Sequence, residues 1–313
     1  MYSPNIFDLR IIRDSSHLTK LLLILLITFS SLLIIGFLFI LLSVPLFHIN
    51  MTDLNKLLEG ELGQNIGLIK YYQASQSVAL FIVPSIILNY LIFTKSQHLI
   101  QNSKLPSFFF IIVALLLTIF MIPLIDEFMH LNEMVRFPEI LENKFQDLEK
   151  EAGKITDKLL SGSSFSDLLI NTLVIAIIPA IGEEFYFRGI WQQFFIRWLK
   201  NGHLGVIFGA ILFSSIHLQF YGFIPRMMLG ILFGYVFYWS NNIWLPVLGH
   251  FLNNFITVVI QHFKIGNILQ QYCFTTSNLF DRYILLIVSV ILSILMIVLL
   301  RKICLKRTIV KHL

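Results

Sequence analysis

Two adjacent carboxylates and an arginine interrupt an otherwise apolar segment of this chain. Glu183, Glu184 and Arg188 lie within residues 181–190, which read IGEEFYFRGI. A charged side chain at membrane depth costs about 2.5 to 3.5 kcal/mol on insertion scales, so such residues are rare there and mark functional sites by default. These three residues are therefore the first candidates for chemistry.

Helical spacing gives the two carboxylates different roles. Residues four apart share a helix face, so Glu184 can form an ion pair with Arg188, whereas Glu183 points about 100° away. A carboxylate in an ion pair is a poor base, and Glu183, left unpaired and partly desolvated, is the better general base. The alternative interpretation is an ion pair that only anchors the helix end among the lipid headgroups. Pro179 lies just upstream and predicts a bend at this point of the helix.

Further polar groups interrupt two later apolar segments. His217 lies in FSSIHLQF, and His250 and Asn254, four residues apart in GHFLNNF, share one helix face. Groups this costly are best explained if they converge on one cavity inside a helical bundle. The set suits two hydrolytic chemistries, a glutamate that activates water beside oxyanion donors, or a Glu/His cage for a divalent metal such as zinc.

The composition is that of a polytopic membrane protein. Of 313 residues, 57% are hydrophobic and 13% are charged, which is unlike a soluble domain of this length. The basic residues lie at the chain ends and in short loops rather than in a stripe, so we expect no nucleic-acid partner. With about 20 apolar residues for each span, we expect about eight spans, at 21–46, 74–93, 107–125, 166–190, 204–220, 223–239, 243–262 and 283–300.

The lysines and arginines predict how the chain is oriented. If the N-terminus is cytoplasmic, every basic cluster falls on the cytoplasmic side and the long acidic connection 126–158 falls on the other side. We therefore expect a multi-pass protein of the inner (cytoplasmic) membrane with both termini in the cytoplasm. Within the connection, apolar residues at alternating four- and three-residue steps predict an amphipathic helix that begins near Pro138. That helix would lie on the outer membrane surface or cap the bundle.

These features define an all-α fold, a polytopic transmembrane bundle with one extramembrane amphipathic helix. We divide the chain into an N-terminal three-span region, an outer-face helix with its linker, a catalytic core, and a last span with a basic tail, at 1–125, 126–165, 166–262 and 263–313.

The depths of the two histidines conflict in this arrangement. At 1.5 Å per residue from the cytoplasmic ends, His250 lies about 10 Å deep and His217 about 20 Å deep. We therefore expect the fifth span to begin later than Leu204 and the fourth helix to continue through 191–200.

The polar motifs resemble those of a known family. The CPBP intramembrane proteases, which include the type II CAAX prenyl endopeptidases and the bacterial Abi proteins, carry E-E-x-x-x-R, F-x-x-x-H and H-x-x-x-N. This sequence has them in the same order, at Glu183, Glu184 and Arg188, at Phe213 and His217, and at His250 and Asn254. The resemblance covers residues 166–262.

The resemblance implies a membrane endopeptidase whose site opens toward the cytoplasm. It implies that Glu183 activates water, that His217 positions the water, and that His250 and Asn254 stabilise the oxyanion, with Glu184 and Arg188 as a structural pair. Family members are also described as metalloproteases, in which case Glu183, His217 and His250 would hold the metal. The implied substrate is a peptide or lipidated peptide in the bilayer, such as a prenylated CAAX tail or a bacteriocin-like peptide.

Two other functions use the same residues. A proton-coupled transporter would employ the carboxylates and histidines as a relay, but it should repeat polar-interrupted spans in both halves, and the first three spans lack them. A non-catalytic membrane immunity protein would keep the fold without the activity. The sequence indicates no particular oligomeric state.

Overall fold

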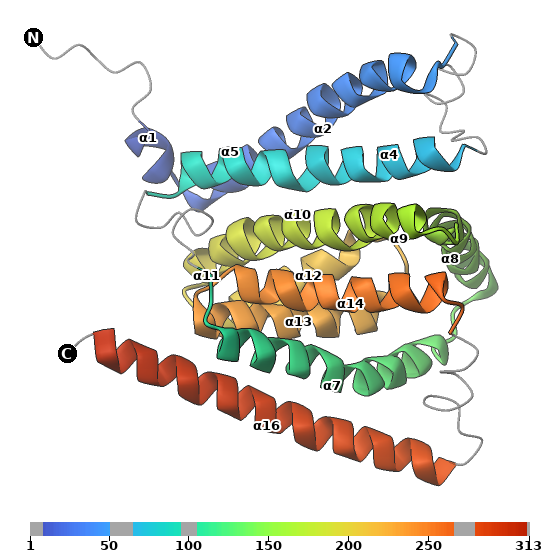
Figure 1. Cartoon of the computed structure of the whole chain (residues 1–313). Helices are drawn as coiled ribbons and strands as arrows, with labels where there is room; N and C mark the ends of the chain where they lie inside the picture. The colour runs from blue at the N-terminus through green and yellow to red at the C-terminus, as the bar shows by residue number, and fades with distance from the viewer. Residues whose placement is uncertain (1–8, 51–64, 95–104, 266–278, 312–313) are drawn as a thin grey trace, which may run out of the picture.

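The chain forms a bundle of α-helices in a computed structural model, which describes residues 9–50, 65–94, 105–265 and 279–311 (Figure 1). Every regular element within these residues is a helix. The all-α polytopic fold predicted from the sequence is therefore confirmed.

Short π-helical turns interrupt two of the long helices. In chain order the elements are α1 (Arg10–Arg13), α2 (His17–Phe47), α4 (Ile66–Ser77), η1 (Val78–Ile82), α5 (Val83–Ile92), α7 (Phe108–Glu133), α8 (Glu139–Leu160), α9 (Phe165–Asn171), η3 (Thr172–Ile177), α10 (Ile178–Tyr186), η4 (Phe187–Gln192), α11 (Gln193–Leu199), α12 (Gly202–Ser215), α13 (Phe223–Ser240), α14 (Trp244–His262) and α16 (Leu279–Lys311).

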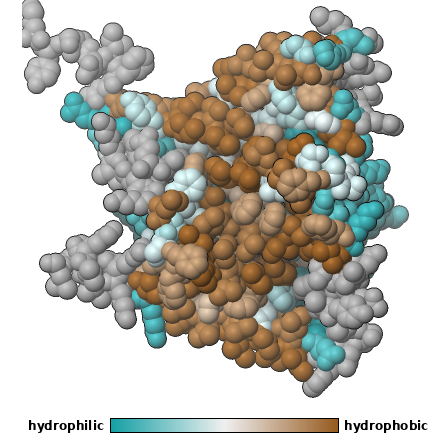
Figure 2. Space-filling model, viewed as in Figure 1, coloured by the Kyte–Doolittle hydropathy of each residue, from teal (hydrophilic) through white to brown (hydrophobic). Residues whose placement is uncertain are grey.

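Six helical runs of the described chain are long and apolar enough to cross a membrane. They are His17–Phe47, Ile66–Ile92, Phe108–Glu133, Phe165–Leu199, Phe223–Ser240 and Asp281–Cys304. The other two expected spans correspond to α12, which is apolar but shorter, and to α14, which has 19 residues and carries the polar H-x-x-x-N motif. Figure 2 shows a broad hydrophobic belt across the bundle with hydrophilic residues toward its two ends, as a membrane protein requires.

The fifth predicted span, 204–220, is wrong at both ends. Its helix α12 begins earlier, at Gly202, because the Asn201 side chain accepts hydrogen bonds from the first backbone N–H groups as an N-cap. The helix then ends at Ser215, so His217 lies on the following turn rather than inside a span. A helix of 14 residues is about 21 Å long, shorter than the hydrocarbon core of about 30 Å.

Two long helical runs share one local feature, a π-helical turn shortly before a proline. In each, a π-helical turn directly precedes a proline, with η1 before Pro84 and η3 before Pro179. Proline lacks an N–H and its ring clashes with the carbonyl four residues back, and a wider turn relieves that clash. A π-helical turn thus lies just before Pro179, where the sequence predicts a bend, and the run continues to Leu199, as expected for 191–200.

These two runs pack closely against each other beside the carboxylates. Gly182 faces η1 at the point of contact, and a Cβ atom at this position would lie 3.1 Å from the Ile82 side chain and 3.2 Å from Phe81. The absence of a side chain therefore lets α10 approach the N-terminal helices.

The helix α8 lies at the opposite end of the bundle from α1 and the C-terminal end of α16 (Figure 1). It follows Pro138 and contacts α4 and α14, so the predicted amphipathic helix caps one end of the bundle.

Candidate active site

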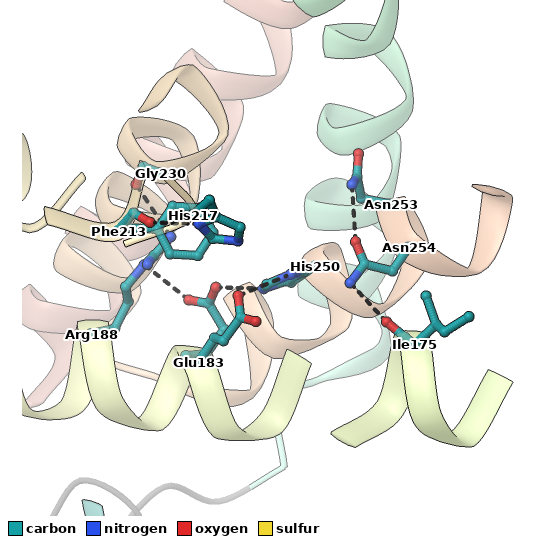
Figure 3. Close-up of polar contacts among 10 residues, drawn as sticks. Ile175, Glu183, Arg188, Phe213, His217, Gly230, His250, Asn253 and Asn254 are labelled. Atoms are coloured by element: carbon teal, nitrogen blue, oxygen red, sulfur yellow. Dashed lines mark hydrogen bonds and ion pairs between the residues drawn. The ribbon is translucent and has the colours of Figure 1, made fainter. Parts of the chain in front are cut away.

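The Glu184 carboxylate is the centre of a buried polar network (Figure 3). Its Oε2 atom lies 2.9 Å from Nε of Arg188, as the four-residue spacing predicts, and both side chains are buried. Its Oε1 atom lies 2.9 Å from Nδ1 of His250. Because an ionised carboxylate can only accept hydrogen bonds, Nδ1 of His250 must donate, which leaves Nε2 for other partners.

Arg188 and Gln192 fasten this helix to α13. The Arg188 Nη2 atom donates to the Gly230 carbonyl at 3.4 Å, and Gln192 Nε2 donates to the Gly234 carbonyl at 3.1 Å. Gly234 allows the close approach, since a Cβ there would lie 3.1 Å from Oε1 of Gln192. These two hydrogen bonds join η4, which carries Arg188 and Gln192, to α13.

Glu183 differs from its neighbour in having room at its carboxylate. Among the described residues no side chain donates a hydrogen bond to it, and its nearest charged partner is His250, whose Nε2 lies 3.8 Å from Oε2. One water molecule can contact both atoms across such a gap. Glu183 is thus the carboxylate that can exchange a proton with water.

His250 is fixed on four sides. Besides the two glutamates, its ring stacks on Phe233 with centroids 5.7 Å apart and meets the edge of Phe213 at 6.0 Å. The neighbouring Gly249 leaves space for Phe233, because a Cβ there would lie 2.8 Å from that ring. The imidazole orientation is therefore set by packing as well as by hydrogen bonding.

His217 lies near this network but on different support. Its Nδ1 atom is 3.0 Å from the Phe213 carbonyl and its ring meets the edge of the Phe213 ring at 5.4 Å. Since a carbonyl only accepts, Nδ1 donates and Nε2 is left to accept. Figure 3 shows His217 and His250 on the same side of Glu183, and among the described residues no hydrogen bond or ion pair joins His217 to Glu183.

The turn that carries His217 is held by residues that the sequence analysis did not single out. Asn132 of α7 donates to the Phe220 carbonyl at 2.6 Å, and the Tyr221 hydroxyl donates to Glu142 of α8 at 2.7 Å. Arg226 of α13 donates to the side-chain and backbone oxygens of Gln219 at 2.9 and 2.8 Å. These partners come from outside the motifs, so no spacing in the sequence could have indicated them.

An aromatic cluster adds to this attachment of α8. Phe220 of the turn meets Phe137 edge-on at 4.6 Å and stacks with Phe145 at 5.1 Å. The hydroxyl of Tyr221 also holds the pKa of the Glu142 carboxyl below its ordinary value. The His217 turn is therefore packed against α8.

Asn254 does not turn toward the carboxylates. Its Nδ2 donates to the Ile175 carbonyl at 3.1 Å, and its Oδ1 accepts from Asn253 at 3.2 Å. Pro179, four residues after Ile175, has no N–H to complete the α-helical bond, so Asn254 supplies the missing donor. One of its two amide hydrogens is used in this way.

The predicted metal ligands do not converge. No group of three or more His, Cys, Asp or Glu side chains in the described part of the chain is arranged to hold a metal ion. His250 and His217 each use Nδ1 for a hydrogen bond, which leaves Nε2 of each ring for other partners. The described side chains are nevertheless not gathered into a ligand group, so the metalloprotease alternative is not supported.

Comparison with known proteins finds a family model that is similar to the region containing this network. Residues 165–256 match the family model described as type II CAAX prenyl endopeptidase Rce1-like. The chain is also 27% identical over 104 residues to the uncharacterized protein YpbD of Bacillus subtilis (strain 168). The matched segment covers 32% of this chain and 48% of YpbD. The chain thus spans about half the length of that relative, and no solved structure matches it.

The matched region contains every motif residue, from Glu183 to Asn254, and excludes α8, the N-terminal helices and α16. Residues 165–256 of this chain are therefore similar to the type II CAAX prenyl endopeptidase Rce1-like family model.

Proposed function

We propose that this protein is an intramembrane endopeptidase that hydrolyses a peptide bond of a membrane-associated substrate. The observation that supports this most directly is the contrast between the two adjacent carboxylates. Glu184 is neutralised by Arg188, whereas Glu183 has no hydrogen-bond donor among the described side chains and lies 3.8 Å from Nε2 of His250. One carboxylate is thus committed to structure and the other is left for proton transfer.

In this mechanism Glu183 takes a proton from a water molecule in the gap beside His250. The resulting hydroxide attacks the carbonyl carbon of the scissile bond and forms a tetrahedral oxyanion. The C–N bond then breaks, and Glu183 returns its proton to the leaving amine, so that water and peptide give an acid and an amine. The neutral Nε2 of His217 would accept a hydrogen bond from the attacking water and so orient it.

The oxyanion is assigned to His250 and Asn254. Because Nδ1–H of His250 is committed to Glu184, a donor at Nε2 requires the ring to carry both protons. Since Glu184 is already paired with Arg188, Glu183 is the carboxylate that would balance this charge. Asn254 would use the amide hydrogen that is not bonded to Ile175. Both donors lie on one face of α14, one turn apart.

The proposed substrate is a prenylated CAAX-type tail or a bacteriocin-like peptide, each of which presents its scissile region at the bilayer. The proposed location is the inner membrane with cytoplasmic termini, because the basic clusters of the sequence favour that orientation.

The test is cleavage by the full chain in proteoliposomes, assayed against prenyl-peptide and membrane-peptide panels with and without chelator. Glu183→Gln removes the base but keeps the side-chain shape, and we expect the rate to fall by about 10²- to 10⁴-fold. The matched control is Glu127→Gln, which removes a carboxylate paired with Arg282 outside the matched domain. Unchanged turnover in Glu183→Gln would refute the mechanism, and activity lost on chelation and restored by zinc would replace it with a metal-dependent one.

A further inference from the structure

A pocket lies away from the carboxylates, where the ends of several helices meet beside α8. Its volume is about 530 Å³, within the usual range for small-molecule sites. The last residue of α2, the first turns of α4, the Ser161–Gly162 linker and the α9–η3 run line it. The pocket is thus at a level where helices end, at the same end of the bundle as α8 (Figure 1).

The walls of this pocket are apolar and partly open to the outside. Phe47, Ile66, Ile170 and Val174 contribute to the lining. Ile66 and Ile170 remain 42% and 46% exposed, although both belong to helices apolar enough to cross a membrane. In a bilayer these exposed side chains meet lipid, so an acyl chain can enter the pocket from the side.

One of the side chains that line this largely apolar pocket is a buried cation. Lys70 is only 6% exposed, and its ammonium donates to the Ser161 carbonyl at 3.2 Å. Among the described residues no carboxylate is in ion-pair contact with it. Burying an ammonium without an anion is costly, so this position favours a negatively charged ligand.

Asp167 is the carboxylate whose charge acts on Lys70, although the two side chains are not in ion-pair contact. Asp167 also lines the pocket, and its Oδ2 accepts from the backbone N–H and the hydroxyl of Ser164, at 3.1 and 2.6 Å, in a capping box at the start of α9. These bonds hold Asp167 in the helix cap and leave the Lys70 ammonium open to direct contact with a phosphate. An anionic headgroup therefore suits the pocket better than a zwitterionic one, whose ammonium would need a carboxylate of its own.

We propose that this pocket binds an anionic phospholipid, with one acyl chain against the apolar walls and the phosphate on Lys70. The site is separate from the proposed catalytic residues and does not depend on proteolysis. It would tie α4 to the linker and to α9, and so brace the start of the helix that carries Glu183.

The experiment uses the full chain in phosphatidylcholine vesicles that contain a trace of photoactivatable lipid. Three probes carry the same diazirine acyl chain and differ in headgroup, as phosphatidylglycerol, phosphatidylcholine and diacylglycerol. Peptide mapping should find the phosphatidylglycerol probe on the Ile170 and Val174 wall about tenfold above the other two.

Variants of the pocket distinguish specific binding of the anionic headgroup from general contact with lipid. Lys70→Met should lower phosphatidylglycerol labelling about tenfold, to the level of the other probes, whereas Lys70→Arg should keep it. Lys154→Met is the matched control, because it removes an exposed lysine of α8 at the same end of the bundle and should change nothing. Ala74→Phe should fill the pocket and abolish labelling by all three probes.

Equal labelling by all probes, or unchanged labelling in Lys70→Met, would overturn the proposal and show ordinary bilayer contact only. Competition by free glycerol phosphate would also overturn it, since it would show a site for phosphate without an acyl chain. The Glu183→Gln variant should be labelled like the wild type. The labelling experiment therefore tests the lipid site even if the protease proposal fails.

Discussion

Two long helical runs of this protein share the same backbone feature, a π-helical turn before a proline, but have different neighbours. In each, a proline follows a π-helical turn, and a buried polar residue lies five positions after the proline, Asn89 after Pro84 and Glu184 after Pro179. The first run packs on α2, whereas the second contacts α13 and α14. A buried polar group thus follows the π-helical turn and proline in both runs, and the neighbouring helices decide which of the two enters a charged network.

Both runs also receive a hydrogen bond from a neighbour at the disturbed turn. In the first, Val83 N–H bonds Val78 instead of Ala79, and Ser31 of α2 donates to the Ala79 carbonyl at 2.6 Å. In the second, Asn254 of α14 donates to the Ile175 carbonyl at 3.1 Å. The difference teaches that Asn254, a motif residue, has a structural function that a plain serine performs in the other run.

The largest effect should come from breaking the charged network of the second run. Arg188→Leu leaves Glu184 buried and unpaired on that side, and we expect a loss of about 3–5 kcal/mol of stability. Asn89→Leu, at the corresponding place in the first run, removes no charge and should cost clearly less. The measurement is unfolding of the purified protein in detergent micelles.

The double variant Arg188→Leu with Glu184→Leu is the control for this prediction. Removing both charges should recover much of the loss, because no uncompensated charge remains. A double variant as unstable as Arg188→Leu alone would mean that the arginine acts through its contacts with α13 and Phe213 rather than through the ion pair.

A smaller loss of stability should follow from removing either hydrogen-bond donor at the π-helical turns, Ser31 or Asn254. Asn254→Leu and Ser31→Ala each remove a hydrogen bond to a buried carbonyl, and each should cost about 1–3 kcal/mol. If Asn254 also donates to the oxyanion, cleavage by Asn254→Leu should fall by about 10²-fold or more, while Ser31→Ala keeps its rate. Thermal unfolding and initial rates are measured on the same preparations.

The structural part of that prediction has its own test. Pro179→Ala, introduced into Asn254→Leu, supplies an N–H four residues after Ile175 and should restore part of the stability without restoring cleavage. Equal recovery of both would indicate that the amide of Asn254 acts only on the helix backbone.

The smallest effect concerns the contact between Glu142 of α8 and Tyr221 of the His217 turn. The Tyr221 hydroxyl lowers the pKa of Glu142, so this contact stabilises α8 docking above the ordinary glutamate pKa and is lost as pH falls through the lower, folded value. Limited proteolysis at the Ser161–Ser164 linker between pH 7 and pH 3 should therefore accelerate at the acid end. Glu142→Gln should weaken docking at neutral pH and flatten this part of the pH dependence, and an unchanged profile would contradict the assignment.

The sequence by itself determined the features that depend on local spacing and composition. The apolar runs indicated the helices, because about 20 residues of apolar sequence have few other stable forms in a bilayer. The four-residue step from Glu184 to Arg188 predicted their ion pair, since it is a contact within one helix. The same spacing argument singled out Glu183, because no basic residue lies three or four positions away from it on the helix.

Contacts between distant segments were decided only by the tertiary structure. The end of α12 before His217, the two-sided contacts of His250, and the bond from Asn254 to Ile175 all depend on helices that meet only in the folded bundle. The same is true of the hydrogen bonds that hold the His217 turn, whose partners lie in α7, α8 and α13. A helix dictates the direction of its own side chains through its period, but which carbonyl or carboxylate they reach is set by packing between helices.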